Sequence, residues 1–565
     1  MFSIIDLKYK SLLMTQRKLL SFLLCSQLLV TIFGFASEKD KYYENLYYTA
    51  KFWGFLKYYH PVVASGQSDW NLELIQQLEN LEKCKGQEEV KQFFESWLAE
   101  LKSPSKCRKC KKQGKKEYDD RNFDLSWIEN TSFWGAKLSG QLGYIRDNRY
   151  LGEPFYLERK PAGNILLKNE NGPESYDWKK KEHRLLTWFQ YWNLVEYFFP
   201  YKYQCDQDWD EVLKEMTPRF LNVESEEEFH MLLLECFAKT DDSHARFYSE
   251  QTVNHFGTKW LPIQFKLIDG KAIVTGFYND SMAKKDGFHL GDVITHVDGE
   301  SVQKRFERNK KYLCASNEAV KRRNTISAIF NGDTEEVKLK IERNGQIEES
   351  IYKRYSFRDF SYHYHSKRER FKSWEDGLAY VNLGKVSREQ VDSLMDSLMH
   401  FKGIVFDLRE NANSTLYQLS AYLNQEPMPF VVFTKPDLSY PGRLIWTKPY
   451  YCGSSKGKKY TGKVMILVNE LTQSHGEFSC MCLQTGDRVQ VLGSQSSGAD
   501  GNVNRIKLIG GFETVFSGIG VFYPDRSETQ RVGVRRDYSV SPTIKGMQEG
   551  RDEQLEEALR ILRAE

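Results

Sequence analysis

The chain has 565 residues, of which 40% are hydrophobic and 28% are charged. This length exceeds what one hydrophobic core supports, so we expect two to four domains, and the composition excludes a largely disordered chain. The 80 Lys and Arg residues nearly balance the 77 Asp and Glu residues, and the formal net charge of +3 gives no reason to expect a nucleic-acid partner.

The N-terminus has the pattern of an export signal. Arg17 and Lys18 precede an apolar run that ends in G-F-A at residues 34–36, which puts small residues at positions −3 and −1 of a cleavage site. This order is typical of a secretory signal peptide. We therefore predict a signal over residues 1–36, a periplasmic or cell-surface protein, and no stable membrane insertion after cleavage. A retained membrane anchor is the alternative, which the polar residues within the run disfavour.

Residues 37–250 are predicted to form a helical domain with an internal repeat. The pattern Trp-x7-Pro-x7-Asp-Trp starts at Trp53 and again at Trp192, an offset of 139 residues. The pattern indicates an aromatic helix stopped by proline, a turn and a second helix. We interpret the two copies, residues 53–100 and 192–239, as units that bury their aromatic faces together, and we assign them no chemistry.

The segment between the copies, residues 103–182, is predicted to be an insertion with one or two hairpins. It contains the one tight cysteine pair of the chain, Cys107 and Cys110. A zinc site would need a second pair or nearby histidines, whereas the neighbouring residues are lysines. We therefore predict no metal site and interpret the pair as part of a solvated loop or as a local disulfide formed after export.

Residues 258–352 change to alternating strand patterns around a turn at Asp269-Gly270. The stretch that begins at Ser281 resembles the bacterial PDZ pattern S-P-A-x-x-A-G-L-x-x-G-D-x-I-x-x-I-x-G, with glycines where tight turns require them. The matching residues are Ser281, Ala283, Gly287, Gly291, Asp292, Ile294 and Gly299. We therefore expect a PDZ-like β domain here.

A PDZ domain binds a peptide end by adding it as a strand to the edge of its sheet. The resemblance therefore implies a substrate-binding role for Leu261 and Ile263, at the position of the terminal-carboxylate loop. Pro262 lies between them and lacks a backbone N–H, which argues against capture of a terminal carboxylate there.

Residues 374–565 alternate short apolar strands with helices. The predicted helices lie at about 387–402, 414–424 and 474–485, and a last helix closes the chain. This alternation is typical of an α/β domain with a largely parallel sheet.

One strand-to-helix turn of this domain stands out. A buried strand runs to Asn469, a polar turn follows, and a helix starts near Ser474. Such turns project a side chain beyond the carboxyl edge of the sheet, and the free N–H groups of a helix start stabilise a nearby oxyanion. The alternative is structural, because Ser474 and Glu477 also have the spacing of a capping box.

Several motifs in order resemble the catalytic domain of C-terminal-processing (tail-specific) serine proteases from Gly403 to Leu559. They include G-I-V-F-D-L-R-E-N, L-V-N-E-L-T-Q-S-H-G-E and G-V-F-Y-P-D-R-S-E-T-Q-R-V-G-V. The resemblance implies a crotonase-like or ClpP-like α/β fold, Ser474 as the nucleophile, a peptide or protein substrate, and no cofactor or metal.

The general base implied by the resemblance is a histidine. The tail-specific enzymes with a Ser–Lys dyad carry a lysine where this chain has Ala499. The tricorn-like branch instead takes a histidine from a Ser-His pair before the PDZ domain, which implies His244 as base with Ser243 helping to orient it. The first copy has Ser105 at the position of His244, so the helical repeat itself does not demand the pair.

The remaining site residues also follow from the resemblance. An acidic residue near the end of the domain would orient the histidine; Gln530 stands at the family spacing, and we prefer Glu528, two residues earlier. The oxyanion hole would combine the His475 N–H with one from the segment that contains Ala412 and Asn413.

The sequence therefore predicts a multidomain α+β protein that acts as an exported serine endopeptidase, with a PDZ-like domain that positions peptide substrate. The alternative is a catalytically inactive binding protein or scaffold with the same fold.

Overall fold

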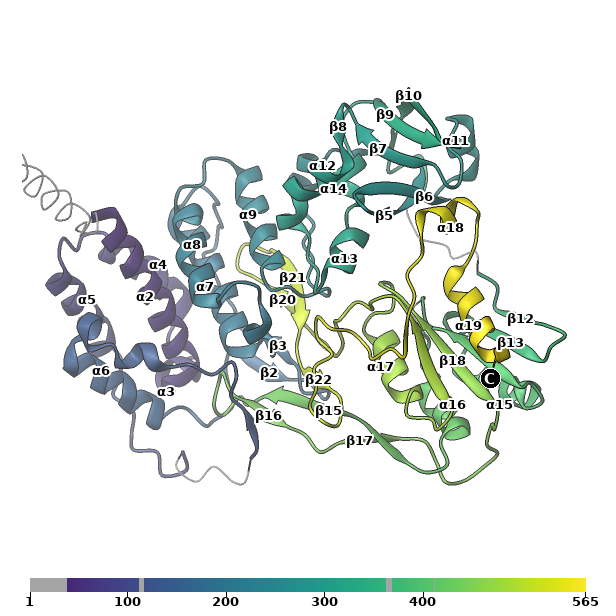
Figure 1. Ribbon diagram of the computed structural model, residues 1–565. Coiled ribbons are helices and arrows are strands. Elements are labelled where there is room, and N and C mark those ends of the chain that lie inside the picture. Colours follow the sequence, from purple (N-terminus) through teal and green to yellow (C-terminus); the bar gives the residue numbers. More distant parts are fainter. Residues whose placement is uncertain (1–37, 111–115, 362–367, 411, 565) are drawn as a thin grey trace, which may run out of the picture.

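The computed structural model describes residues 38–110, 116–361, 368–410 and 412–564 (Figure 1). The predicted signal peptide lies outside these residues. A helical N-terminal region, a β-rich unit and a C-terminal α/β domain follow one another along the chain, so the predicted mixed α+β organisation with a helical N-terminal region is confirmed. Within the described ranges, no helix combines the length and the apolar character needed to cross a bilayer.

Six helices of the N-terminal region form two sets of three. The first set is α2 (Glu38–Tyr59), α4 (Trp70–Leu81) and α5 (Gln87–Ala99), and the second is α7 (Lys181–Phe198), α8 (Trp209–Leu221) and α9 (Glu226–Ala238). Both ends of α9 are offset from those of α5 by the same 139 residues. Pro61 and Pro200 follow the ends of α2 and α7, because proline cannot donate the next helical hydrogen bond.

Each set is locked by a reciprocal pair of tryptophans. Trp53 Nε1 donates to the carbonyl of Trp70 at 2.9 Å, and Trp70 Nε1 donates to the carbonyl of Trp53 at 2.9 Å. Trp192 and Trp209 repeat the arrangement at 2.8 and 3.0 Å. All four rings are buried, so these bonds satisfy polar groups that water cannot reach.

The segment between the sets reaches across to the C-terminal domain. It holds a short hairpin of β2 (Leu157–Arg159) and β3 (Ile165–Leu167), and helix α6 (Thr131–Asp147). Strand β1 (Tyr118–Asp119) pairs with β16 (Leu444–Trp446) of the C-terminal half. Cys107 and Cys110 are joined by a disulfide.

The β-rich unit is built on one antiparallel sheet with the order β10-β9-β7-β6-β5. Its strands are β5 (Ile263–Ile268), β6 (Lys271–Phe277), β7 (Val293–Val297), β9 (Glu336–Arg343) and β10 (Gln346–Lys353). Strand β5 is an edge strand and lies on the side that faces the C-terminal domain (Figure 1). The unit has its own apolar core.

The C-terminal domain contains a mainly parallel sheet covered on both faces. The sheet order is β12 (Phe371–Ser373), β13 (Leu378–Asn382), β14 (Gly403–Asp407), β18 (Lys463–Val468), β19 (Val489–Gly493) and β23 (Tyr538–Ser539), and only β12 is antiparallel.

Alternate residues of the central strands pack on opposite faces, because successive strand side chains point in opposite directions. Ile404 and Phe406 join the core formed with α15 (Val391–Leu398), α16 (Leu416–Leu423) and α17 (His475–Leu483), whereas Val405 joins the core under α19 (Glu553–Ala564).

Candidate active site

Ser474 stands at the N-terminal end of α17, where the chain leaves the carboxyl edge of the parallel sheet. Strand β18 ends at Val468, and Ser474 has φ 54° and ψ −117°. A positive φ costs a non-glycine residue about 1–3 kcal/mol and is held only by surrounding contacts. One such contact is the bond from the Ser474 N–H to the carbonyl of Ala499 at 2.9 Å.

The Ser474 hydroxyl is not used as a helix cap, because its side chain forms no capping hydrogen bond. Glu477, the other half of the expected capping box, is buried and accepts hydrogen bonds from Ser496 Oγ at 2.6 Å and from the N–H groups of Gly498 and Ala499 at 2.7 and 3.0 Å. Burial raises the pKa of the Glu477 carboxyl. Glu477 therefore fixes the loop whose Ala499 carbonyl holds the Ser474 backbone.

His244 lies in the loop that follows α9, and its two ring nitrogens have different surroundings. Nδ1 is 2.9 Å from Ser517 Oγ and 3.5 Å from Asp242 Oδ1. Nε2 is buried and has no hydrogen-bond partner among the described residues. If Nδ1 carries the proton and donates it toward Ser517 and Asp242, Nε2 is left as a free acceptor, which is the state a general base requires.

Asp242 is fully buried beside this imidazole. Its Oδ1 accepts from the His244 N–H at 3.0 Å and from Ser517 Oγ at 3.2 Å, and its Oδ2 accepts from the Ser517 N–H at 2.5 Å. Although burial disfavours the charged form, the hydrogen bonds from His244 and Ser517 and the charge of His244 lower the pKa of Asp242 below its usual value. Asp242 is thus a carboxylate positioned to stabilise a protonated imidazole.

The loops that carry Ser474 and His244 are joined through their neighbouring residues. Gln473 Nε2 donates to the carbonyl of Ser243 at 3.2 Å, which links the residue before Ser474 to the residue before His244. Ser497 adds to the joint, because its Oγ donates to Gln473 Oε1 at 2.9 Å and its carbonyl accepts from Ser243 Oγ at 3.2 Å. The fold thus brings Gln473 into contact with Ser243, 230 positions earlier in the chain, and so joins the loops that carry Ser474 and His244.

One segment expected for the oxyanion hole contacts this helix start. The N–H of His475 belongs to the first turn of α17, where helix geometry leaves N–H groups without an intrahelical acceptor. His475 Nε2 lies 3.2 Å from the carbonyl oxygen of Asn413, which brings the second expected segment against α17. Ala412 is buried, and Asn413 Nδ2 donates to the carbonyls of Gly384 and Val386 at 3.2 and 2.8 Å.

Glu528 and Gln530 lie in different surroundings. The Glu528 carboxylate accepts hydrogen bonds from Arg121, from Tyr203 at 2.8 Å and from Gln204 at 2.7 Å, so its contacts run toward the helical region and not to His244. Gln530 is buried, and its Nε2 lies 3.4 Å from Ser316 Oγ. Among the described residues, the carboxylate in contact with the His244 ring is that of Asp242, at 3.5 Å.

Sequence reasoning missed Asp242 and Ser517. Asp242 had a signal, because it precedes His244 by two residues in the same D-D-S-H segment. Ser517 had none, since it ends β21 (Glu513–Ser517), far along the chain, and only the fold brings it to the imidazole.

Leu261 and Ile263 have side chains that are 2% and 1% exposed, and both pack in the core of the β-rich unit. Other residues of β5, including Gln264 and Lys266, line a cleft of about 760 Å³ between this unit and the C-terminal domain. The cleft reaches Asn469, Glu470 and Leu471 on the loop that leads to Ser474.

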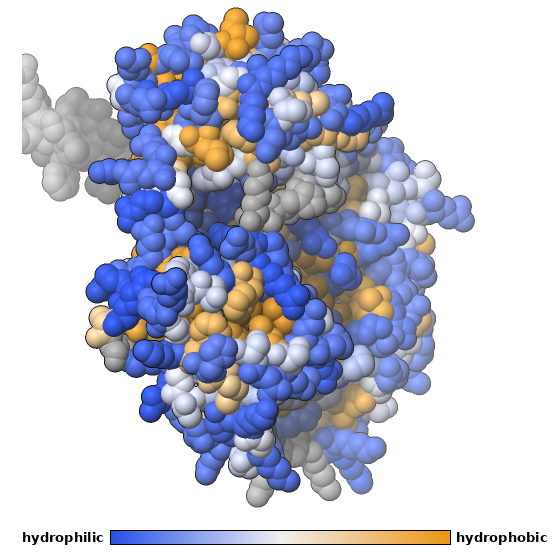
Figure 2. Space-filling model, turned by 90° about the vertical axis from the view of Figure 1, so that its right-hand side faces the viewer, coloured by the Kyte–Doolittle hydropathy of each residue, from blue (hydrophilic) through white to orange (hydrophobic). Residues whose placement is uncertain are grey.

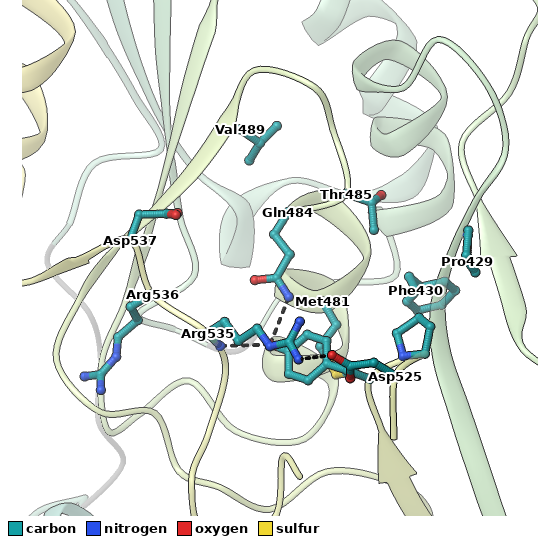
Figure 3. A pocket seen from close by; sticks show the side chains of 12 residues that line it. Pro429, Phe430, Met481, Gln484, Thr485, Val489, Asp525, Arg535, Arg536 and Asp537 are labelled. Carbon is teal, nitrogen blue, oxygen red and sulfur yellow. Dashed lines mark hydrogen bonds and ion pairs between the residues drawn. The ribbon is translucent and has the colours of Figure 1, made fainter. Parts of the chain in front are cut away.

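A second hollow of about 450 Å³ lies at the other end of α17 (Figure 3). Met481, Gln484 and Thr485 line it, about 15 Å along the helix from Ser474 at 1.5 Å per residue. Its polar groups are engaged with one another: Gln484 Nε2 donates to Tyr523 Oη at 2.9 Å, and Arg535 pairs with Asp525 at 2.6 Å. Across the described parts of the chain, no group of three or more His, Cys, Asp or Glu residues is arranged to hold a metal ion.

Residues 377–540 match the model of peptidase family S41. No curated protein matches the sequence.

Among solved structures, mature CPAF complexed with lactacystin is 13% identical with a TM-score of 0.52, covering 68% of this chain and 98% of that one. Mature CPAF alone is 14% identical with the same TM-score, covering 68% and 96%. The photosystem II D1 C-terminal processing protease is 16% identical with a TM-score of 0.38, covering 66% and 98%. At these identities, the likeness to CPAF shows the fold.

Proposed function

We propose that this chain is an exported endopeptidase that hydrolyses peptide bonds with Ser474 and His244. Its C-terminal domain belongs to peptidase family S41, a family of serine-type peptidases. The observation that carries the proposal is the state of the His244 imidazole. Its Nδ1 is engaged by Ser517 and Asp242, its Nε2 is buried without a hydrogen-bond partner among the described residues, and its loop is bonded to the loop of Ser474.

The proposed reaction is acyl transfer through a covalent ester. Ser474 Oγ attacks the peptide carbonyl carbon while His244 Nε2 takes the hydroxyl proton, and the same nitrogen then delivers this proton to the leaving amine. A water molecule then attacks the ester carbonyl carbon while His244 Nε2 takes a proton from the water. The bond between the acyl carbon and Ser474 Oγ breaks, His244 returns the proton to Ser474 Oγ, and the new carboxyl end of the peptide leaves. Each step forms an imidazolium ion for part of its course, and the buried negative charge of Asp242 stabilises that ion.

The oxyanion formed in both steps would lie at the start of α17. The N–H of His475 and the positive end of the helix dipole supply donors and charge there. The segment with Ala412 and Asn413 would supply the second N–H donor. The contact of the His475 ring with the Asn413 carbonyl places this segment beside the start of α17. The backbone of Ser474 has a positive φ, and its hydroxyl is not used to cap the helix.

The β-rich unit is proposed to be a PDZ-like domain that positions substrate. Two observations support this role: the glycine pattern that starts at Ser281, and the edge strand β5 beside the cleft that leads to Ser474. An extended peptide can add to such an edge. Export is proposed from the N-terminal signal pattern and from the disulfide between Cys107 and Cys110, since disulfides persist mainly in oxidising compartments.

The test is labelling by a fluorophosphonate probe, which reacts with an activated serine. The wild-type protein should be labelled, Ser474→Ala should not, and His244→Ala should react slower by on the order of 10³-fold or more. Ser105→Ala is the matched control, because Ser105 is exposed and holds the position of His244 in the first helical copy. Its labelling should equal that of the wild type.

A wild-type protein that is labelled no faster than Ser474→Ala would contradict the hydrolase proposal. The chain would then be a binding protein or scaffold that keeps the family fold without its chemistry. Labelling that is lost in Ser474→Ala but unaffected in His244→Ala would keep the nucleophile and reject the base.

A further inference from the structure

The β-rich unit and the C-terminal domain are separated by a cleft over part of their facing surfaces. Figure 2 shows this hollow between the upper and lower lobes, with mainly hydrophilic walls. The segment 314–317 of the β-rich unit, between η3 (Lys310–Tyr312) and α13 (Glu318–Arg323), is packed against the neighbouring regions instead. Its first three residues are buried, and Cys314 belongs to the apolar core of the helical region.

A reciprocal pair of serines joins this segment to the loop of His244. The Ser243 N–H donates to Ser316 Oγ at 2.7 Å, and the Ser316 N–H donates to Ser243 Oγ at 2.8 Å. Ser316 is fully buried, and Ser243 is 8% exposed. Each serine thus satisfies polar groups of the other that water does not reach. Ser243 directly precedes His244, so the pair acts on the backbone that carries the imidazole.

Each polar group of Ser243 is engaged by a residue other than His244. Besides its two bonds with Ser316, Ser243 donates through Oγ to the carbonyl of Ser497 at 3.2 Å. Its own carbonyl accepts from Gln473 Nε2 at 3.2 Å. Ser243 therefore holds the backbone of the His244 loop, and Ser316 supplies two of the four bonds by which it does so.

The His244 loop needs such support because its backbone is strained. Asp241 has φ 48°, and a residue with a side chain keeps this conformation only where surrounding contacts hold it. Asp206 supplies one contact, since its N–H donates to Asp241 Oδ2 at 2.7 Å. The pair of Ser243 and Ser316 supplies further contacts two residues along the chain.

Ser316 is itself anchored to the C-terminal domain. Its carbonyl accepts from Arg531 Nε at 3.1 Å. The next residue, Asn317, donates through Nδ2 to the carbonyls of Ser496, Ser497 and Arg531 at 3.0, 3.1 and 3.1 Å. The position of Ser316 is therefore fixed independently of its bonds to the His244 loop.

We propose that Ser316 is a positioning residue for the reaction, which acts through Ser243 to fix the backbone of His244 relative to Ser474. The β-rich unit therefore completes the active site in addition to lining the cleft. This role rests on the proposed function, in which His244 is the base. Ser316 is not a catalytic residue, because its contacts reach the His244 loop only through Ser243.

The test measures both the rate and the final extent of fluorophosphonate labelling of the full-length protein. Ser316→Ala should slow labelling by on the order of 10- to 100-fold, because a displacement of the base by about 1 Å is enough for such a loss. The final extent should equal that of the wild type, because the folded chain keeps its nucleophile.

The His244→Ala protein tells positioning apart from general support of the fold. When Ser316→Ala is added to it, labelling should be no slower than in His244→Ala alone, because Ser316 acts only through the imidazole. Further slowing in the double variant would overturn the proposal, since Ser316 would then support Ser474 or the whole fold.

Ser420→Ala is the matched control. Ser420 on α16 is also fully buried, and its Oγ accepts from the Gly453 N–H at 3.0 Å, so this change removes the same kind of bond from a contact that involves neither candidate-site loop. Both alanine variants should have similarly lowered melting temperatures, since each leaves a buried N–H without its acceptor. Only Ser316→Ala should be labelled more slowly.

Equal labelling rates for Ser316→Ala and Ser420→Ala would overturn the proposal while His244→Ala remains slow. Failure of the hydrolase proposal has a different signature: a wild-type protein that is labelled no faster than Ser474→Ala. That result would remove the role of Ser316 together with the reaction it serves.

Discussion

The two helical copies share the order of their helices and their tryptophan pairs, and they differ in the segment that follows their last helix. Helices α5 and α9 end at Ala99 and Ala238, an offset of 139 residues. After α9, the chain turns through Asp242 and His244, and both side chains are held against the C-terminal domain by Ser517. The first copy has Ser103 and Ser105 at these positions, and both are exposed.

The copies also meet each other at equivalent positions. Gly54 of α2 and Asn193 of α7 are 139 residues apart, and Asn193 Nδ2 donates to the carbonyls of Ala50 and Phe189 at 3.0 and 2.9 Å. A Cβ at Gly54 would lie 1.7 Å from Asn193 Oδ1. At this contact, the first copy supplies a glycine and the second copy supplies an asparagine side chain. The repeat supplies a scaffold, and one copy places a residue in the candidate site.

Among changes made at equivalent positions of the two copies, Asp242→Asn should have the largest effect. The imidazole would lose its charged partner, so the rate of fluorophosphonate labelling should fall by on the order of 10³- to 10⁴-fold. Ser103→Ala changes the equivalent position of the first copy and should have no effect. If the two variants react at the same rate, the assignment of Asp242 as the residue that positions His244 is wrong.

A pH series tells this role apart from a purely structural one. Because the pKa of Asp242 in the folded protein is held below its usual value of 3.8, its contribution to stability is present above that pH and is lost as the pH falls further. The difference in melting temperature between the wild type and Asp242→Asn should therefore shrink below about pH 4. The labelling defect at neutral pH should remain under conditions where both proteins are folded.

The next largest effect should appear where the two copies cross. Gly54→Ala should destabilise the fold by about 3 kcal/mol, because the new methyl group has no space beside Asn193. Combining it with Asn193→Ala should cost less than the sum of the two single changes, since the smaller side chain makes room. Chemical denaturation measures all three differences.

Gly143→Ala is the control for this experiment. Gly143 lies in helix α6, and a Cβ there meets nothing within 4 Å. This change should be neutral or slightly stabilising, because alanine favours helices more than glycine does. A Gly54→Ala protein that is as stable as Gly143→Ala would show that the two copies pack less tightly than the Gly54–Asn193 contact implies.

The sequence allowed prediction of features that rest on spacing within one segment. The repeat offset locates the helices, since the Trp-x7-Pro-x7-Asp-Trp pattern recurs without a gap. The family motifs locate Ser474 at a strand-to-helix turn, and the absence of a histidine from the first copy directs attention to His244.

Features that depend on contacts between distant segments could not be predicted in this way. Glu528 follows a left-handed residue, Arg526 with φ 64°, and its carboxylate ends beside Arg121 and Tyr203 of the helical region. Ser517 meets His244 only because β21 lies against the second helical copy. Neither contact leaves a local pattern in the sequence.

The smallest effect should come from the tryptophan pairs. Equivalent changes in the two copies should lower the stability of the protein equally, but only the change in the second copy should lower its activity. Trp70→Phe and Trp209→Phe each remove a buried N–H donor and leave the carbonyl of Trp53 or Trp192 without its partner, so each should cost about 2 kcal/mol. Helix α8 begins at Trp209 and packs on α9, which leads to the loop of His244, so only Trp209→Phe should also slow labelling, by a few fold. Slower labelling in Trp70→Phe at full folding would mean that the first copy, too, positions the candidate site.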